Sequence, residues 1–292
     1  MVRLGVYDLL LLLKPKVLLA MTAIYAFSYI ISFVAITNTP FQAYSFFVGF
    51  IAVFTAVGGS NALNCYIERD IDAVMTRTMS RPIPRGTVKP VHALASGLLL
   101  LISAAFISMS LGVYQLLLFS MGVWFYIVVY TMFLKRKTPL NVLATAPSVA
   151  APAWFGWLMG GSPFNLQALI LGLFVAVWGL LHLWSIAYVF DKDYSRCDIP
   201  MLPVVASPKI AVYTVFASLL LLFSYSLMLG LWAKTSAYVL IISIINVPFL
   251  LLGLRFLRVP TKRNGWLLFK LSAPYILVIL AALTMDNILN QL

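Results

Sequence analysis

The stretch NALNCYIERDIDAVMTRTMSRPIP, from Asn61 to Pro84, follows a long apolar run and carries three carboxylates, Glu68, Asp70 and Asp72. The whole chain of 292 residues has only eight acidic residues, so three of them within five positions are a marked concentration of negative charge. Carboxylates beside a membrane-spanning helix are costly unless they are paired or bind a metal. This stretch therefore predicts the end of a helix and a functional site together.

The composition excludes an ordinary water-soluble protein. The chain is 63% hydrophobic and only 10% charged, and its mean hydropathy is +1.01, which leaves too little polar surface to cover a soluble core. Apolar runs close to the roughly 20 residues that a helix needs to cross a bilayer predict an all-α membrane protein, a single domain over residues 1–292 with nine transmembrane helices around a central, lipid-open cavity. The predicted spans are residues 17–36, 43–66, 91–110, 113–134, 139–159, 166–190, 208–231, 236–256 and 265–284.

The basic residues predict the orientation of these helices. With the N-terminus in the cytoplasm, 19 of the 20 basic residues fall on the cytoplasmic side and only Lys234 on the other, which is the positive-inside bias. We therefore expect a multi-pass protein of the plasma membrane with cytoplasmic site loops. The N-terminal stretch MVRLGVYDLLLLLKPK has no cleavage site and predicts a short helix on the membrane surface. The net charge of +12 points to contact with anionic lipid, not to nucleic acid.

The first acidic cluster has a helical spacing. Asn64, Glu68 and Asp72 follow an i, i+4, i+8 pattern and should form one stripe, with Asp70 on the opposite side. Two carboxylates a few ångströms apart repel by roughly 4 kcal/mol at an effective dielectric near 20, and a divalent cation turns this repulsion into attraction. Oxygen ligands favour a hard ion such as Mg²⁺. The alternative is a set of salt bridges to nearby basic residues, which are Arg69, Arg77 and Arg81.

The second acidic cluster lies after the sixth span, in WSIAYVFDKDYSRCDIPMLP (Trp184 to Pro203), and contains Asp191, Asp193 and Asp198. On one continuous helix His182, Ile186 and Asp193 share a face, and His182 would lie roughly 16 Å deeper in the membrane than Asp193. Two prolines, Pro200 and Pro203, are expected to stop that helix. Because both clusters fall on the cytoplasmic side, they predict one shared site.

Acidic metal sites at the mouth of an apolar cavity suit an isoprenyl diphosphate, whose anionic head needs Mg²⁺ and whose hydrocarbon tail needs a lipid-like pocket. Mg²⁺ would stabilise the departing diphosphate, and aromatic faces could stabilise the allylic cation. Tyr130 and Tyr188 are the candidates for that role. The residues from Arg77 to Pro90 are expected to form a loop with a short helix that closes over the diphosphate.

These motifs resemble the UbiA-type intramembrane prenyltransferases, and within them the heme O synthases, which farnesylate protoheme IX. The resemblance rests on five stretches in the same order: NCYIERDIDAVMTRTMSRPIPRG at 64–86, YTMFLKRKTPLN at 130–141, GW at 156–157, HLW at 182–184 and KDYSRCDIPMLPVV at 192–205. Departures from the family pattern are Glu68 in place of aspartate, Gly-Leu-Leu before His182, and Ala-Thr-Ala-Pro-Ser at 144–148.

The resemblance implies transfer of a farnesyl or longer prenyl group from prenyl diphosphate to the 2-vinyl group of protoheme IX, with Mg²⁺ as cofactor and heme-oxidase assembly factors as further partners. It implies a role for each candidate residue, with Lys-Asp-Tyr at 192–194 as the second motif. The catalytic set is Asn64, Glu68, Asp72 and Asp193; the metal ligands are Glu68, Asp72, Asp193 and Asp191; the diphosphate contacts are Arg77, Arg81, Lys135, Arg136 and Lys192; the heme contacts are His182 and Tyr130; and Asp70, Tyr188, Tyr194 and Asp198 lie nearby.

Three other functions remain open on the sequence alone. A prenyltransferase could instead use an aromatic acceptor such as 4-hydroxybenzoate or a quinone precursor, or a glycerol phosphate. A transporter would be expected to carry charges at the membrane midplane and inverted repeats, whereas the charges here lie at the rim. A non-catalytic heme or quinone chaperone would not need two carboxylate clusters. Cys65 and Cys197 are expected to be free thiols.

Overall fold

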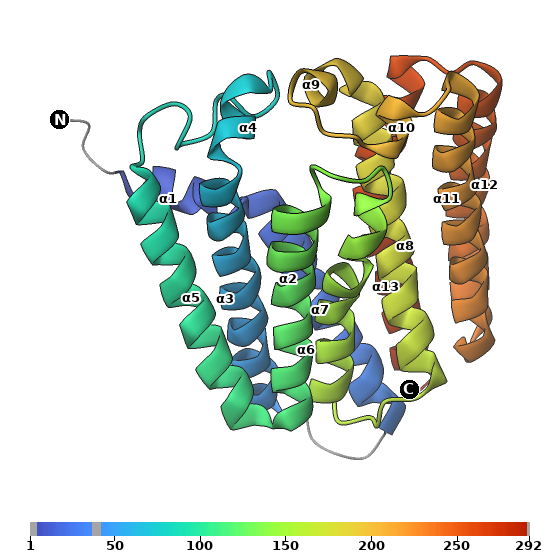
Figure 1. Cartoon of the computed structure of the whole chain (residues 1–292). Coiled ribbons are helices and arrows are strands. Elements are labelled where there is room, and N and C mark those ends of the chain that lie inside the picture. The colour runs from blue at the N-terminus through green and yellow to red at the C-terminus, as the bar shows by residue number, and fades with distance from the viewer. Residues whose placement is uncertain (1–4, 37–41, 291–292) are drawn as a thin grey trace.

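The computed structural model describes residues 5–36 and 42–290, and within these ranges the chain is helical and has no strand. Figure 1 shows the long helices running side by side across one layer, with short helices along one edge. The elements are α1 (Val6–Leu12), α2 (Pro15–Ile36), α3 (Ala43–Ile67), α4 (Arg69–Val74), α5 (Pro90–Leu111), α6 (Val113–Val123), η1 (Trp124–Leu134), η2 (Asn141–Thr145), α7 (Ala146–Met159), α8 (Leu166–Val189), α9 (Asp191–Arg196), α10 (Leu202–Val205), α11 (Pro208–Leu229), η3 (Gly230–Trp232), α12 (Ser236–Arg258) and α13 (Lys262–Leu289).

The described residues contain nine helical segments long and apolar enough to cross a membrane, as the sequence predicts. Three of them combine two elements: α6 continues into the π-helix η1, the 3₁₀ turn η2 leads into α7, and α11 ends in the 3₁₀ turn η3. The chain is therefore a multi-pass membrane protein. The expected short N-terminal helix is α1, which exposes Val6, Tyr7 and Leu10.

The ends of the helices follow from local chemistry. Pro90 and Pro208 stand in the first turns of α5 and α11, where a missing N–H costs nothing. Asn165 caps α8 by accepting the N–H of Ala168 (2.9 Å). Gly112 connects α5 to α6 with φ at +138°, a conformation that favours glycine. It forms the tight connection that the Leu-Gly-Val sequence at 111–113 predicts.

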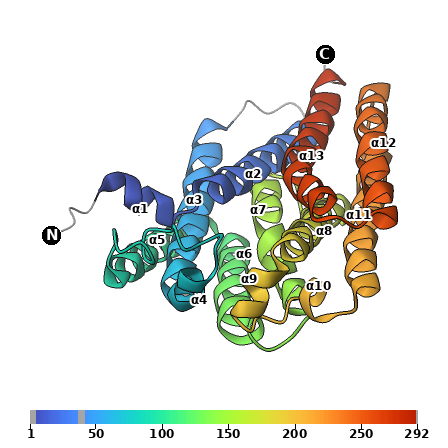
Figure 2. The same ribbon diagram turned by 90° about the horizontal axis from the view of Figure 1, so that it is seen from above.

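Helix α8 is the centre of the bundle, with 72% of its span buried, and it packs against α7, α11 and α13. The spans formed by α5 and by α6 with η1 are only 17% buried, so they lie at the periphery. Viewed from above in Figure 2, α2, α3, α6, α7 and α8 surround the middle of the molecule. The short helices α4, α9 and α10 all lie toward the same end of the bundle as α1 in Figure 1. Both acidic segments therefore lie on one side of the bundle.

Candidate active site

A cavity of about 860 Å³ opens between these helices. Its polar end is lined by side chains from both acidic segments and from the loops beside them, among them Asn64, Glu68, Asp72 and Tyr194. Its remaining wall is largely apolar and aromatic. A cavity with a charged mouth and an apolar body suits an amphiphilic substrate with an anionic head.

In the first acidic segment, Asn64, Glu68 and Asp72 stay on one side of the chain although the helix breaks between α3 and α4. Helix α3 ends at Ile67 and α4 begins at Arg69, yet the N–H of Glu68 bonds to Asn64 O (2.9 Å) and that of Asp72 to Glu68 O (2.8 Å). These i to i−4 bonds continue the helical spacing through the break. Asn64, Glu68 and Asp72 consequently lie on one side, each at most 3% exposed, and all line the cavity.

Each buried carboxylate of this stripe has a basic partner. Lys135 Nζ lies 2.5 Å from Glu68 Oε1, and Arg81 Nη1 lies 2.8 and 2.7 Å from the two oxygens of Asp72. Burial alone would raise the pKa of Glu68, but the surrounding cations, Lys135 first and then Lys14 and Arg81, together lower that pKa. The same pair raises the pKa of Lys135 in spite of its burial. Asp72 thus makes one of the salt bridges that the sequence left open as an alternative.

The second acidic segment differs from the single helix that the sequence predicts. Helix α8 stops at Val189, and Phe190 leaves the helical conformation (φ −102°, ψ 32°) before α9 begins. The break therefore comes ten residues before Pro200. His182 and Ile186 line the cavity, but Asp193 belongs to a separate turn of helix and is not on their face.

Asp193 reaches the site through the first acidic segment. Its Oδ2 accepts the backbone N–H of Arg77 (3.1 Å), and the carboxylate is only 5% exposed. The Arg77 guanidinium donates to the Tyr194 hydroxyl (3.3 Å). The two acidic segments therefore meet at the cavity mouth. The connection from Arg77 to Lys89 contains turns and no helix, so the short helix predicted there is absent from this described loop.

The π-helix η1 brings three polar side chains onto the cavity wall. Its wider turn places Tyr126, Tyr130 and Lys135 roughly one turn apart, and the Lys135 N–H bonds to Tyr130 O (2.9 Å). The rings of Tyr126 and Tyr130 stack at 6.4 Å, and Lys135 Nζ lies 5.6 Å from the centre of the Tyr130 ring. π-Helical turns are rare and frequently occur at functional sites. Tyr126 could not be predicted from the sequence, because a π-helix leaves no periodic pattern of its own.

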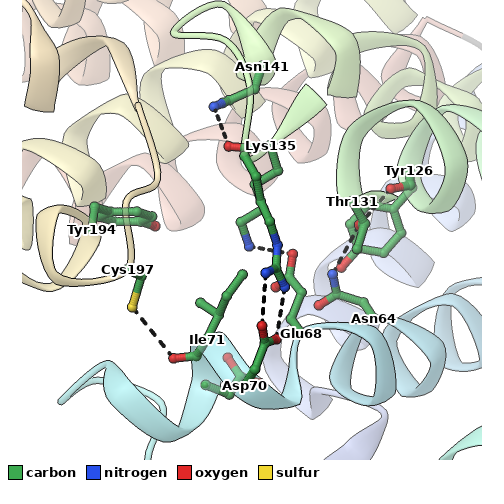
Figure 3. A network of polar contacts seen from close by, with 12 residues as sticks. Asn64, Glu68, Asp70, Ile71, Tyr126, Thr131, Lys135, Asn141, Tyr194 and Cys197 are labelled. Carbon is green, nitrogen blue, oxygen red and sulfur yellow. Dashed lines mark hydrogen bonds and ion pairs between the residues drawn. The ribbon is translucent and has the colours of Figure 1, made fainter. Parts of the chain in front are cut away.

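Lys14 is a further site residue. From the sequence alone it is only one of the basic residues that predict the orientation of the helices in the membrane. It joins α1 to α2 with φ at +51°, lines the cavity, and donates from Nζ to Asn64 Oδ1 (2.5 Å). The amide of Asn64 is held on its other side by Thr131 Oγ1 (3.1 Å). Burial lowers the pKa of Lys14 to about 8. Figure 3 shows Asn64 facing Thr131 and Tyr126, with Glu68 and Lys135 close by.

Several predicted site residues lie outside the cavity lining. Asp70 points away from the stripe, as predicted, and pairs with Arg136 (2.8 Å), both side chains being well exposed; the hydrogen bond from Arg136 lowers the pKa of Asp70. Asp191 pairs with Lys262 (2.7 Å). The Tyr188 hydroxyl donates to Pro260 O (2.7 Å). Lys192 and Asp198 are exposed. The predicted site residues that do not line the cavity are Asp70, Arg136, Tyr188, Asp191, Lys192, Asp193 and Asp198. Of these, Asp193 is joined to the cavity-lining Arg77 by its bond to the Arg77 backbone.

The donor set at the mouth suits a hard divalent cation, because Glu68, Asp72 and Asp193 supply buried oxygen ligands. In the described ranges no three Asp, Glu, His or Cys side chains are close enough to hold an ion together. In this structure the three carboxylates bond instead to Lys135, Arg81 and the Arg77 backbone N–H, and the predicted metal site stays a prediction.

His182 lies on the cavity wall beyond these charges. Its Nδ1 is 2.8 Å from Ser272 Oγ on α13. Its ring packs between Trp178 (5.2 Å between ring centres) and Phe269 (4.3 Å). The wall around His182 is thus aromatic, and the cavity-lining Lys270 lies over the ring of Trp266 (5.2 Å to its centre), which stacks on Phe269.

Comparison with known proteins places this geometry in a family. The sequence model of the UbiA prenyltransferase family matches residues 19–274. Relatives named protoheme IX farnesyltransferase include one from Caldivirga maquilingensis, 36% identical over 240 residues, covering 80% of this chain and 84% of the relative. A second, from Korarchaeum cryptofilum, is 32% identical over 288 residues, with 98% and 95% covered.

Solved structures show the same fold at low sequence identity. A digeranylgeranylglyceryl phosphate synthase superposes with a TM-score of 0.77 at 19% identity, covering 97% of this chain and 98% of the other. A UbiA homolog from Archaeoglobus fulgidus, solved with DMAPP and Mg²⁺, superposes with a TM-score of 0.64 at 14% identity, covering 94% and 99%. The chain therefore has the fold of these proteins.

Proposed function

Because the chain belongs to the UbiA prenyltransferase family, we propose that it transfers a farnesyl or longer prenyl group from prenyl diphosphate to the 2-vinyl group of protoheme IX, giving heme O and diphosphate. Relatives that are 30% to 36% identical over most of the chain carry the name protoheme IX farnesyltransferase. The observation that carries the proposal is the cavity itself, which has paired charges at its mouth and an imidazole among aromatic rings further along its wall.

Glu68, Asp72 and Asp193 are the candidate ligands of Mg²⁺, because carboxylate oxygens are donors that this ion prefers. The three carboxylates do not form one cluster in this structure, so each would hold the ion together with oxygens of the diphosphate and water. When bound, the ion supplies charge that stabilises the departing diphosphate. A UbiA homolog of the same fold that is bound to GPP and Mg²⁺ supports the choice of this ion.

The basic residues at the mouth bind the diphosphate. Lys135 and Arg81 pair with Glu68 and Asp72 in this structure, and phosphate oxygens can replace those carboxylates as their partners. Arg77 and Lys14 line the same end of the cavity. The pairs therefore keep both the anion-binding and the metal-binding groups of the site charged and in place before substrate arrives.

The prenyl chain lies along the apolar wall. Tyr130, next to Lys135, has its aromatic face near the place where the carbon–oxygen bond breaks, and this face stabilises the allylic cation. The enclosed apolar wall excludes bulk water until the vinyl group has reacted. Water then adds to the neighbouring carbon and gives a hydroxyethylfarnesyl side chain. His182 contacts the acceptor.

The reaction takes place at the cytoplasmic face of the plasma membrane in this proposal. The charged segments α4 and α9 lie on the same side of the bundle as the start of the chain, and nearly all basic residues fall on that side. Heme O would pass from there to the assembly of a heme-containing oxidase.

The test is reconstitution of the purified chain in lipid nanodiscs with Mg²⁺, farnesyl diphosphate and protoheme. We expect hydroxyethylfarnesyl heme and an equal amount of diphosphate, and we expect both to disappear when Mg²⁺ is chelated. A panel with 4-hydroxybenzoate and a glycerol-phosphate acceptor separates the alternatives. Product from one of these acceptors and none from protoheme would replace the proposed acceptor and leave prenyl transfer intact.

A further inference from the structure

Ser272 links α13 to the imidazole on the cavity wall. Its side chain is fully buried, and its Oγ contacts two groups, His182 Nδ1 at 2.8 Å and the backbone carbonyl of Phe269 at 2.8 Å. None of the family motifs that the sequence shows includes Ser272. Its position nevertheless gives it control over the one histidine that lines the described cavity.

The count of protons in this arrangement fixes the tautomer of His182. A serine hydroxyl carries one hydrogen, and the carbonyl of Phe269 can only accept a hydrogen bond. The Ser272 hydrogen is therefore directed at Phe269 O. Ser272 Oγ must then accept a hydrogen from His182, so the imidazole carries its proton on Nδ1 and has a free electron pair on Nε2.

The rest of the ring's surroundings fix its orientation. Trp178 and Phe269 pack against the imidazole at interplanar angles of 37° and 39°, and among the residues that the structure describes Nε2 has no hydrogen-bond partner. Histidines that bind metals through one nitrogen commonly donate the other N–H to a neighbouring acceptor, which sets tautomer and orientation. His182 has this arrangement, with Ser272 as the acceptor.

We propose that Ser272 is a positioning residue that holds His182 as the Nδ1–H tautomer, so that Nε2 ligates the iron of the porphyrin acceptor. This inference rests on the proposed function for the identity of the acceptor. A role as iron ligand fits the surroundings better than a role as general base. A base would become a cationic imidazolium between two aromatic residues inside a membrane protein, which is costly without a carboxylate partner, whereas an iron ligand remains neutral.

The experiment compares binding of iron protoporphyrin IX with binding of metal-free protoporphyrin IX, because only the first can be ligated. Wild-type protein should bind the iron porphyrin with the absorption and electron-paramagnetic-resonance signature of histidine ligation, and His182→Ala should lose that signature. Ser272→Ala should weaken binding of iron protoporphyrin by about 10- to 100-fold, the usual effect of removing the partner of a metal-bound histidine. Binding of metal-free protoporphyrin should not change.

Two variants serve as controls. Ser218→Ala removes a buried serine that makes the same bond to its own helix (Val215 O, 2.7 Å) but lies in α11, outside the cavity lining, and it should leave both affinities unchanged. Ser272→Thr keeps a hydroxyl and should keep the histidine signature. The KM for prenyl diphosphate should be the same in all these variants.

The outcomes separate the inference from the proposed function. The positioning role would be overturned if Ser272→Ala weakened binding of both porphyrins equally, or if it weakened binding of neither. So would an unchanged iron signature in His182→Ala. If the wild-type protein forms no product from protoheme but the iron-dependent loss in Ser272→Ala remains, the proposed function fails and the positioning role of Ser272 stands.

Discussion

Asp72, in the acidic stripe, and Asp70, on the outer face of the same helix, are only two positions apart in the sequence but have opposite surroundings. Asp72 is 2% exposed and paired with Arg81 at the cavity mouth. The Asp70 side chain is 60% exposed and paired with Arg136 on the outside. The side of the helix, and not proximity in the sequence, decides which carboxylate belongs to the site. This gives a matched pair of variants.

Asp72→Asn and Asp193→Asn should each lower product formation by at least about 100-fold, or about 3 kcal/mol in the barrier, because an amide supplies no negative charge to hold Mg²⁺. Asp70→Asn should keep full activity and cost roughly 0–1 kcal/mol of stability, since its ion pair is exposed. The activity of all three variants is measured as the rate of diphosphate release from farnesyl diphosphate. Release that persists in Asp72→Asn and Asp193→Asn would contradict the site.

Lys14 predicts a pH dependence for prenyl diphosphate binding. Burial lowers its pKa to about 8, so the ammonium loses its charge as the pH rises through 8, and the attraction to phosphate is lost with it. The kcat/KM for prenyl diphosphate, which reports groups of the free enzyme, should therefore fall above pH 8. Lys14→Arg should move this fall to higher pH because a guanidinium remains charged. If kcat/KM fell over the same alkaline pH range in the wild type and in Lys14→Arg, Lys14 would be excluded as the group responsible.

The residues of the site were only partly predictable from the sequence. The stripe of Asn64, Glu68 and Asp72 follows from helical spacing, because hydrogen bonds within the chain preserve that spacing. The partners Lys135 and Lys14 lie 67 and 50 residues away from the groups that they contact, and no local pattern records such long-range pairing. Ser272 is one of many serines in apolar helices and becomes distinctive only through its contact with His182.

At the scale of elements, α3 and α8 end in the same way. Each stops at a residue with a non-helical backbone, Glu68 or Phe190, and continues as a helix of six residues. Neither break coincides with proline or glycine, so no residue in the sequence predicts it. The long spans, in contrast, were predicted closely because their apolar length is set by the membrane and by nothing else in the chain.

The contact between α7 and α2 depends on Gly156. A Cβ there would lie 2.4 Å from Tyr25 O and 3.1 Å from Tyr29 N, so Gly156→Ala must push the two helices apart. Close approach through small residues is a common means of packing membrane helices. We expect a loss of about 1–3 kcal/mol, seen as a lower unfolding temperature in detergent. Gly58→Ala, where a Cβ has only ordinary contacts, is the control, and equal stability of both variants would contradict the packing argument.

Asp286 ties α13 to the start of α12, a role that its place near the chain end did not suggest. Its buried carboxylate accepts the N–H groups of Lys234 (2.6 Å) and Thr235 (3.1 Å) and the hydroxyl of Thr235. Asp286→Asn should destabilise the fold by about 1–3 kcal/mol, because an amide cannot accept all these bonds. The measurement is thermal unfolding, with Asp70→Asn as the exposed control. Unchanged stability would show that the carboxylate does not hold the two helices.

At the scale of the whole molecule, nine spans within the described ranges place α1 and the last turn of α13 on opposite sides of the bundle. The sequence predicts this arrangement and also the common side of the two acidic segments. It does not predict that α8 is the central helix, because α8 and the peripheral spans have similar hydropathy (2.1 for α8, 2.1 for α5 and 2.0 for α6 with η1). Burial is decided by packing between helices, which a one-dimensional pattern does not contain.

Labelling can test the orientation. In a variant without Cys65 and Cys197, single cysteines at the exposed positions Ser80 and Phe164 should react with membrane-impermeant maleimide from opposite sides. Ser80 should be labelled only after the cytoplasmic side is opened, and Phe164 in intact cells. Ser162 is a poor probe because it is buried against Ser32. Labelling of both positions from the same side would overturn the topology, and exchanged sides would reverse the orientation.

The cavity keeps an excess of positive charge in spite of the ion pairs at its mouth. Its lining contains six basic side chains, which are Lys14, Lys16, Arg77, Arg81, Lys135 and Lys270. Only two carboxylates of the lining, Glu68 and Asp72, and the adjacent Asp193 oppose them, so three net positive charges remain. A prenyl diphosphate carries roughly three negative charges, so its arrival brings this region close to electrical balance, whereas a divalent ion alone would add to a charge that is costly at low dielectric. The metal should therefore enter together with the diphosphate and not before it.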